Sequence, residues 1–375
     1  MNRGCGVGLV LSACVLASLH SAPALACGGG GVTSRVGVTM NAQRIFMSVR
    51  ATGTTDIVAQ ITVPQTTADY GVLIPVPDEP TLDSEPVSAD DLNALDDATA
   101  PLITKYTGNP EGGISCGCGA AGDEEVTKGG NRGVTVSDQV TIGPVQAVSL
   151  TADSGDAVRA WLTDNGFLLA DADTATFDRY VGNGRYFIAI RRADGASSGG
   201  PSSIGVHYTL PGDHRMLSLG FTRIGAASWL AFTLFLAAPK VIGPSEPFKA
   251  ITLNELSAVN LREVSYAYAI QSAVEVRNSK AFVLESATAI ADIAPAVPGL
   301  ARFIDSGATV TRATTTIARE KIDEDVVFAT PFTADVPAQR YVSLDNSSVR
   351  YAGMGALPLV LLARALRRRS RPRKC

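Results

Sequence analysis

The pattern of apolar and polar positions predicts three strands near the start of the chain. Residues 56–63 alternate with a period of two, which places their isoleucine, alanine and valine side chains on one face. Residues 44–50 alternate in the same way, whereas residues 70–76 are more continuously apolar and stop at prolines. Because turn-type residues separate the three runs, we expect them to form a β-meander.

Two segments carry clear signals for a helix. Ser88 and Asp91 have the spacing of a capping box, and leucines follow at helical spacing until Pro101 ends or kinks the helix. The second segment begins after Ser154, which can cap it, and Gly166 can stop it.

Strands and short helices are expected to continue to about residue 317. A hairpin is predicted from residues 134–141 and 145–151, and residues 229–238 are apolar throughout, as in a strand buried on both faces. Further strands are expected at residues 186–191, 205–210, 216–224, 281–286 and 309–317, and helices at residues 174–181, 261–276 and 300–304. The pattern therefore predicts an α+β fold: mainly antiparallel β-sheet with a few packed helices and a smaller mixed α/β C-terminal part.

The first 26 residues have the layout of a secretory signal peptide. Arg3 provides a basic start, residues 7–19 form an apolar run too short to span a membrane, and a small-x-small triplet ends at Ala26. We expect cleavage there, so that the mature protein begins at Cys27 and is exported to the periplasm, the cell surface or the medium. Acylation of Cys27 is the less favoured alternative, because Ala24 stands where lipoprotein signals usually have leucine.

Composition and charge narrow the class of protein. Hydrophobic residues make up 46% and charged residues 18% of the chain, which is enough apolar material for a packed core. The formal net charge is −4, and it is −5 without Arg3. Because the last stretch holds seven basic residues and no acid, the remaining body carries −12. This acidic body argues against nucleic acid as a partner, since phosphate binding needs a cationic surface.

Four parts are expected along the chain. They are the signal peptide (1–26), a β-rich domain (27–245), a mixed α/β part of the same unit (246–335), and a linker with an apolar and basic tail (336–375).

The C-terminal tail resembles a sorting signal. Gly353 and Gly355 precede an apolar stretch and a basic cluster, an order similar to C-terminal sorting signals of bacterial surface proteins. The cluster includes Arg367, Arg368 and Arg369. Alternatively, the tail is amphipathic and binds anionic lipid, or it is disordered and has no addressing role.

Two interpretations of the cysteines are open once the signal peptide has been cleaved. Either Cys116 or Cys118 bonds to Cys27, which closes a loop of about 90 residues and stabilises by roughly 4–5 kcal/mol on the chain-entropy model. Alternatively, Cys116 and Cys118 form a strained, easily reduced bond that acts in thiol–disulfide exchange. An exported chain favours the structural reading. Cys375 is the remaining thiol.

Several motifs resemble a bacterial secreted family called domain of unknown function 2330. They are Ala26-Cys27-Gly28-Gly29, Tyr70-Gly-Val-Leu-Ile-Pro-Val-Pro77, Cys116-Gly-Cys118-Gly119, Trp161-Leu-Thr-Asp-Asn-Gly-Phe167, Lys280-Ala-Phe-Val-Leu-Glu285 and Val310-Thr-Arg312. The similarity runs from about residue 27 to about residue 332. It implies export and an envelope setting, and it implies no activity.

No set of residues predicts a catalytic or metal site. Only His207 and His214 remain after cleavage, neither is near a cysteine in sequence, and no nucleophile-elbow or zinc-protease motif is present. We expect His207 to point outward from a strand and His214 to lie in a solvated turn. No cofactor is expected.

The sequence therefore predicts an exported envelope protein with a non-enzymatic binding or structural role and an unknown envelope or extracellular partner. A thiol–disulfide redox protein using Cys116 and Cys118 is one alternative, and a secreted hydrolase is another.

Overall fold

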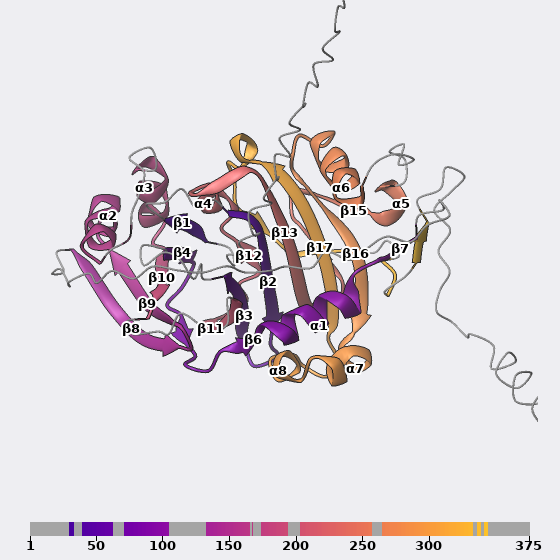
Figure 1. Cartoon of the computed structure of the whole chain (residues 1–375), viewed down its shortest axis with the longest axis horizontal. Helices are drawn as coiled ribbons and strands as arrows, with labels where there is room; N and C mark the ends of the chain where they lie inside the picture. The colour runs from indigo at the N-terminus through magenta and orange to yellow at the C-terminus, as the bar shows by residue number, and fades with distance from the viewer. Residues whose placement is uncertain are drawn as a thin grey trace, which may run out of the picture.

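Two β-sheets pack face to face, and helices cover the outer side of each (Figure 1). The structure is a computed structural model. It describes residues 30–33, 40–62, 71–104, 133–165, 167, 174–193, 203–256, 265–332, 336–338 and 341–343.

The larger sheet, sheet A, has nine strands in the order β15-β16-β17-β13-β2-β3-β11-β5, and β6 also pairs with β11. Its neighbours are antiparallel except for the pairs β13–β2 and β15–β16, which are parallel. The strands are β2 (Met40–Val49), β3 (Thr54–Thr62), β5 (Thr81–Leu82), β6 (Val87–Ser88), β11 (Ser203–Pro211), β13 (Ala226–Ala238), β15 (Lys249–Thr252), β16 (Ala281–Ala289) and β17 (Thr309–Ala318).

The smaller sheet, sheet B, is antiparallel and has the order β1-β4-β10-β9-β8. Its strands are β1 (Gly31–Thr33), β4 (Gly71–Val76), β8 (Val134–Ile142), β9 (Val145–Ala152) and β10 (Tyr186–Arg192). Three strand pairs complete the described β-structure: β12 (Met216–Leu217) with β18 (Val326–Val327), β14 (Ile242–Gly243) with β19 (Thr330–Pro331), and β7 (Leu102–Thr104) with β20 (Tyr341–Ser343).

The helices form the outer layers. Figure 1 shows α2 and α3 beside sheet B, and α1, α7 and α8 near one end of sheet A. The helices are α1 (Ala89–Thr99), α2 (Gly155–Asp164), α3 (Thr174–Gly182), α4 (Leu219–Thr222), α5 (Leu253–Leu256), α6 (Tyr266–Glu275), α7 (Ile290–Ile293) and α8 (Pro298–Ala301), with short 3-10 turns η2 (Ala294–Ala296) and η3 (Arg319–Lys321).

Three apolar clusters explain these layers. The largest lies between the sheets and continues under α6, the second lies between sheet A and the layer of α1, α7 and α8, and the third lies between sheet B and the layer of α2, α3 and α4. Strand β13 supplies Phe232 and Leu234 to the first cluster and Phe235 to the second. Both faces of its C-terminal half are covered, and residues 234–238 are accordingly apolar without a break.

The predicted α+β class is confirmed, and most predicted elements are present. The β8–β9 hairpin turns at Gly143, whose positive φ of 55° suits glycine. Ser88 and Ser154 cap α1 and α2, and each side chain accepts a backbone N–H bond. Helix α1 ends before Pro101, as expected.

The predicted meander is wrong at its third strand. Strand β2 pairs with β3, but β4 lies in sheet B between β1 and β10. Strand β4 is covered on both faces there: Val72 and Ile74 contact the core between the sheets, and Leu73 contacts the core under α2 and α3. A strand covered on both faces belongs inside a sheet that has layers on each side.

The strand predicted at residues 216–224 is also wrong. Only Met216 and Leu217 are extended, and α4 follows. Ser218 donates to the carbonyl oxygen of Pro75 at 3.0 Å, and the N–H of Gly220 donates to the carboxylate of Asp325 at 3.0 Å. These two contacts turn the chain away from the strand.

A buried ion network ties α1 to sheet A. Arg312 of β17 donates to the carboxylates of Glu285 on β16 and Asp96 on α1. Tyr266 of α6 donates to the other oxygen of Glu285, and Arg44 of β2 pairs with Asp96 at 3.2 Å. Glu285 is 1% exposed, so its charge depends on these partners.

We predict that Arg312→Met lowers the free energy of unfolding by about 3–5 kcal/mol, because it leaves the Glu285 charge buried without its partner. The double variant Arg312→Met with Glu285→Gln should cost less than the sum of the two single changes. Denaturant unfolding measures both. Lys249→Gln, which removes an exposed pair with Glu246, is the control and should change stability by less than about 0.5 kcal/mol. Equal effects of Arg312→Met and Lys249→Gln would contradict the role of the network.

Candidate functional site

A buried histidine lies between two aspartates on the outer face of sheet A. His207 lies on β11 and Asp56 on the paired strand β3, where Val58 is the register partner of His207. Nε2 of His207 is 3.0 Å from Oδ1 of Asp56, and Nδ1 is 3.1 Å from Oδ2 of Asp83. Asp83 follows β5, and its backbone N–H donates to the carbonyl oxygen of His207 at 3.2 Å.

The site is closed from above by the segment after α8. The ring of Phe303 stacks on the imidazole with centroids 4.0 Å apart and an angle of 24° between planes. The Arg302 guanidinium lies over the Phe303 ring, 4.6 Å from its centroid. His207 and Asp56 are each only 6% exposed, so water reaches neither side chain freely.

Asp56 also accepts a hydrogen bond from a threonine and forms an ion pair with an arginine. Thr209 Oγ1 donates to its Oδ1 at 2.9 Å, and Nη1 of Arg50 pairs with its Oδ2 at 3.2 Å. Arg50 lies at the β2–β3 turn and also pairs through Nε with Asp305 at 2.9 Å. The network therefore joins β3, β11, the residue after β5, the β2–β3 turn and the segment after α8.

The electrostatics favour charged aspartates. Burial would raise the pKa of Asp56, but hydrogen bonds from His207 and Thr209 and the nearby positive charges outweigh it and hold that pKa below 3.8. Burial likewise opposes ionisation of Asp83, and hydrogen bonds from the Glu85 backbone and His207 keep its pKa lowered. Ionised carboxylates only accept hydrogen bonds, so each ring nitrogen of His207 is placed to donate an N–H to one of them.

This arrangement binds elements together and does not provide a base. A catalytic histidine holds an acid with one nitrogen and uses the lone pair of the other to take a proton from a nucleophile. Here the second nitrogen faces a second carboxylate. The nearby hydroxyl, that of Thr209, donates to Asp56 and not to the ring.

The expectation that His207 points into solvent is wrong, because the outer face of sheet A is covered there by Phe303 and Arg302. His214 is partly exposed at a turn, with Nε2 3.8 Å from Oδ2 of Asp78. The two histidines are therefore in different environments.

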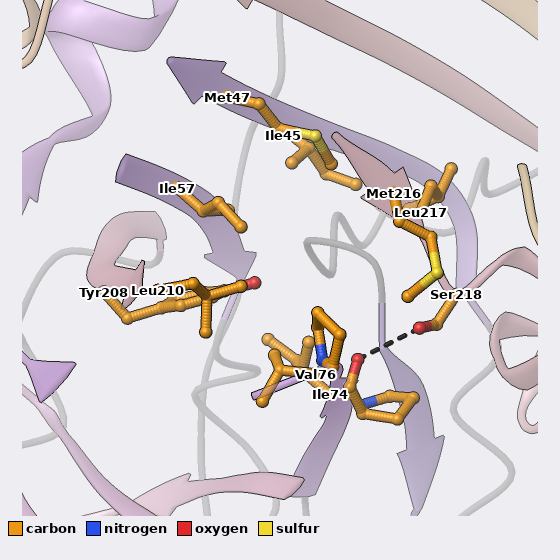
Figure 2. A pocket seen from close by; sticks show the side chains of 12 residues that line it. Ile45, Met47, Ile57, Ile74, Val76, Tyr208, Leu210, Met216, Leu217 and Ser218 are labelled. Atoms are coloured by element: carbon orange, nitrogen blue, oxygen red, sulfur yellow. Dashed lines mark hydrogen bonds between the residues drawn. The ribbon is translucent and has the colours of Figure 1, made fainter. Parts of the chain in front are cut away.

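A small cavity lies between the sheets, on the side of β11 opposite to His207. Figure 2 shows Tyr208 and Leu210 facing the ends of β4 and β12 across it. Its volume of about 20 Å³ is enough for about one water molecule. Burial raises the pKa of the Tyr208 phenol, so this group stays neutral.

The sequence-predicted site residues lie outside the described part of the chain. They are Cys27, Cys116, Cys118, Gly353, Gly355, Arg367, Arg368 and Arg369. The disulfide and tail interpretations stay predictions. Within the described ranges, no group of three or more His, Cys, Asp or Glu side chains is placed to hold a metal ion.

None of the helices in the described ranges has the length and apolar character needed to cross a membrane.

Sequence reasoning missed the histidine network. Two signals were present: Asp56 is an acidic residue inside a strand whose next residues are apolar, and His207 sits between Val206 and Tyr208, both of which are buried. Pairing them needed the β3–β11 register, which joins residues about 150 positions apart.

Comparisons with known proteins give one match. A family model described as an uncharacterised protein conserved in bacteria matches residues 22–228. Neither the curated proteins nor the solved structures contain a significant match.

We predict that Asp56→Asn lowers the free energy of unfolding by about 2–4 kcal/mol near pH 6, because His207 loses an ionised hydrogen-bond acceptor and Arg50 loses an ion-pair partner. The folded pKa of Asp56 is below its unfolded value of 3.8. Its stabilisation is therefore complete above the unfolded pKa and is lost as the pH falls through the folded one. Denaturant unfolding from pH 6 to 3 should show the difference between the two proteins shrinking below about pH 4.

Asp213→Asn is the matched control. Asp213 is exposed and, among the residues that the structure describes, pairs with Arg215 two residues away, so its loss should cost less than about 0.5 kcal/mol at pH 6. A difference between wild type and Asp56→Asn that stays constant down to pH 3 would contradict the network.

Proposed function

The chain belongs to the bacterial family named domain of unknown function 2330, and we propose that it is an exported, non-enzymatic protein of the cell envelope. It acts there by binding an envelope or extracellular partner or by a structural role.

Export rests on the N-terminal pattern. Arg3, the apolar run at residues 7–19 and the triplet ending at Ala26 have the order of a signal peptide. An acidic body suits a soluble exported chain. The basic tail with Arg367, Arg368 and Arg369 offers a second contact with the membrane through anionic lipid.

The non-enzymatic role is supported by one observation above the others: both ring nitrogens of His207 are held by carboxylates. The hydrolase alternative needs a histidine with a free lone pair beside a nucleophile. His207 has instead the contacts of a buried cross-link between strands and an outer segment.

The thiol–disulfide alternative rests on the spacing of Cys116 and Cys118. The acidic residues Asp123, Glu124 and Glu125 follow these cysteines closely, and negative charges near a thiol disfavour the reactive thiolate. This favours a structural bond to Cys27 over a redox role.

Export predicts that the mature protein starts at Cys27 and is found in the envelope or the medium. Ala26→Tyr should block cleavage, because the signal peptidase needs a small residue at that position, and an intact precursor should accumulate. Cell fractionation with mass spectrometry of the N-terminus measures both. Protein that begins at Met1 and remains in the cytosol with reduced thiols would overturn the proposal.

The structural reading of the cysteines predicts a bond from Cys27 to Cys116 or Cys118. Peptide mapping without reductant should identify it, and Cys27→Ser should lower the free energy of unfolding by roughly 4–5 kcal/mol. A bond between Cys116 and Cys118 that opens readily with a mild dithiol would favour the redox alternative instead.

A further inference from the structure

One guanidinium in the described part of the chain is half-buried and poorly paired. Arg185 lies in the turn between α3 and β10, and its backbone N–H donates to the Tyr180 carbonyl oxygen at 3.2 Å. Its Nε is buried and has no hydrogen-bond partner. Its Nη2 donates to the thioether sulfur of Met216 at 3.2 Å.

A thioether is a weak acceptor for a charged donor. Burying part of a guanidinium without a carboxylate costs free energy, because the lost hydration is not replaced by strong hydrogen bonds. Arg185 has no ion pair within the described ranges. It therefore has unused capacity for an oxygen acceptor placed near Met216.

Met216 can supply that oxygen by oxidation. Figure 2 shows its sulfur at the small cavity between the sheets, close to the end of β4. The side chain is half-buried, whereas Met40 and Met47 are 0% and 3% exposed. An oxidant in solution thus reaches Met216 more readily than either of the other two described methionines.

We propose that Met216 is a site of reversible sulfoxidation and that Arg185 binds the sulfoxide oxygen. With hydrogen peroxide as oxidant, a sulfur lone pair attacks one peroxide oxygen, an S–O bond forms and the O–O bond breaks. The departing hydroxide takes the proton of the new S–OH group and leaves as water, which gives the sulfoxide, so sulfur loses the two electrons that the peroxide gains. Sulfoxide reductases reverse the change.

The surroundings accommodate the product. The sulfur must move back so that the new oxygen and the guanidinium nitrogen lie about 2.9 Å apart. The cavity behind Met216, about 20 Å³, gives room for this movement. The sulfoxide oxygen is a stronger acceptor than the thioether, so the Arg185 charge gains the partner that it lacks.

The comparison pair within the same protein is Met40, whose sulfur accepts from Nε2 of Gln43 at 2.8 Å. This donor is neutral and the methionine is fully buried. Met40 therefore has a similar contact to its sulfur, but it is not accessible to solvent and its donor carries no charge. We expect its oxidation to be slow and to disrupt the core packing around it.

The first test is the rate of oxidation in the full-length protein. Its free thiols are alkylated, it is treated with hydrogen peroxide, and peptide mass spectrometry follows each methionine. Met216 should form sulfoxide at least about ten-fold faster than Met40 or Met47, as expected for the more accessible thioether. Equal or slower oxidation of Met216 would overturn the proposal.

The second test measures the coupling between Arg185 and the sulfoxide. Melting temperatures are compared before and after oxidation in wild type, Arg185→Gln and Arg223→Gln, whose arginine is exposed. Oxidation should cost Arg185→Gln about 3 °C more than it costs wild type, because the charged hydrogen bond is missing. Arg223→Gln should match wild type. Equal oxidation penalties in all three proteins would overturn the role of Arg185.

Met216→Leu separates this site from oxidation elsewhere. The melting temperature of this variant should not change under the same treatment. If it falls as much as that of the wild type, the effect arises at another residue and the proposal is wrong.

Discussion

The position of the helix layer formed by α1, α7 and α8 depends on charges that are buried on the outer face of sheet A. Arg312 and Glu285 at one end, and Asp56 and His207 at the other, lie beside an apolar cluster that α1, α7 and α8 cover. A buried charge without its partner costs several kcal/mol, so every element that supplies a partner must take one position. The helices of this layer are short, and these polar contacts add directionality that apolar packing lacks.

Much of the fold follows from local pattern, and the exceptions have a common cause. The β8–β9 hairpin, the two capped helices and the buried strand β13 could be predicted because a turn glycine, a cap serine or a continuous apolar run decides each of them locally. The placement of β4 could not, because an apolar strand fits the inside of either sheet. The sequence also placed His207 wrongly, as an outward polar residue. Its environment is made by Asp83 and Phe303, which are distant in sequence, so the local pattern does not reveal these two contacts.

The histidine network also changes how function is argued for this chain. From the sequence, His207 was one of two residues that could serve a hydrolase. In the structure, its neighbours use both of its nitrogens, and its position between β11, β3 and the outer segment makes it part of the scaffold.

The central claim is that His207 is a buried cross-link held through both ring nitrogens and not a base. Nitrogen NMR of the His207 ring in the folded protein at neutral pH tests it directly. The account predicts a proton on both Nδ1 and Nε2, because each nitrogen faces an ionised carboxylate. A ring that carries a single proton would place a lone pair against Asp56 or Asp83, contradict the account, and restore His207 as a candidate base.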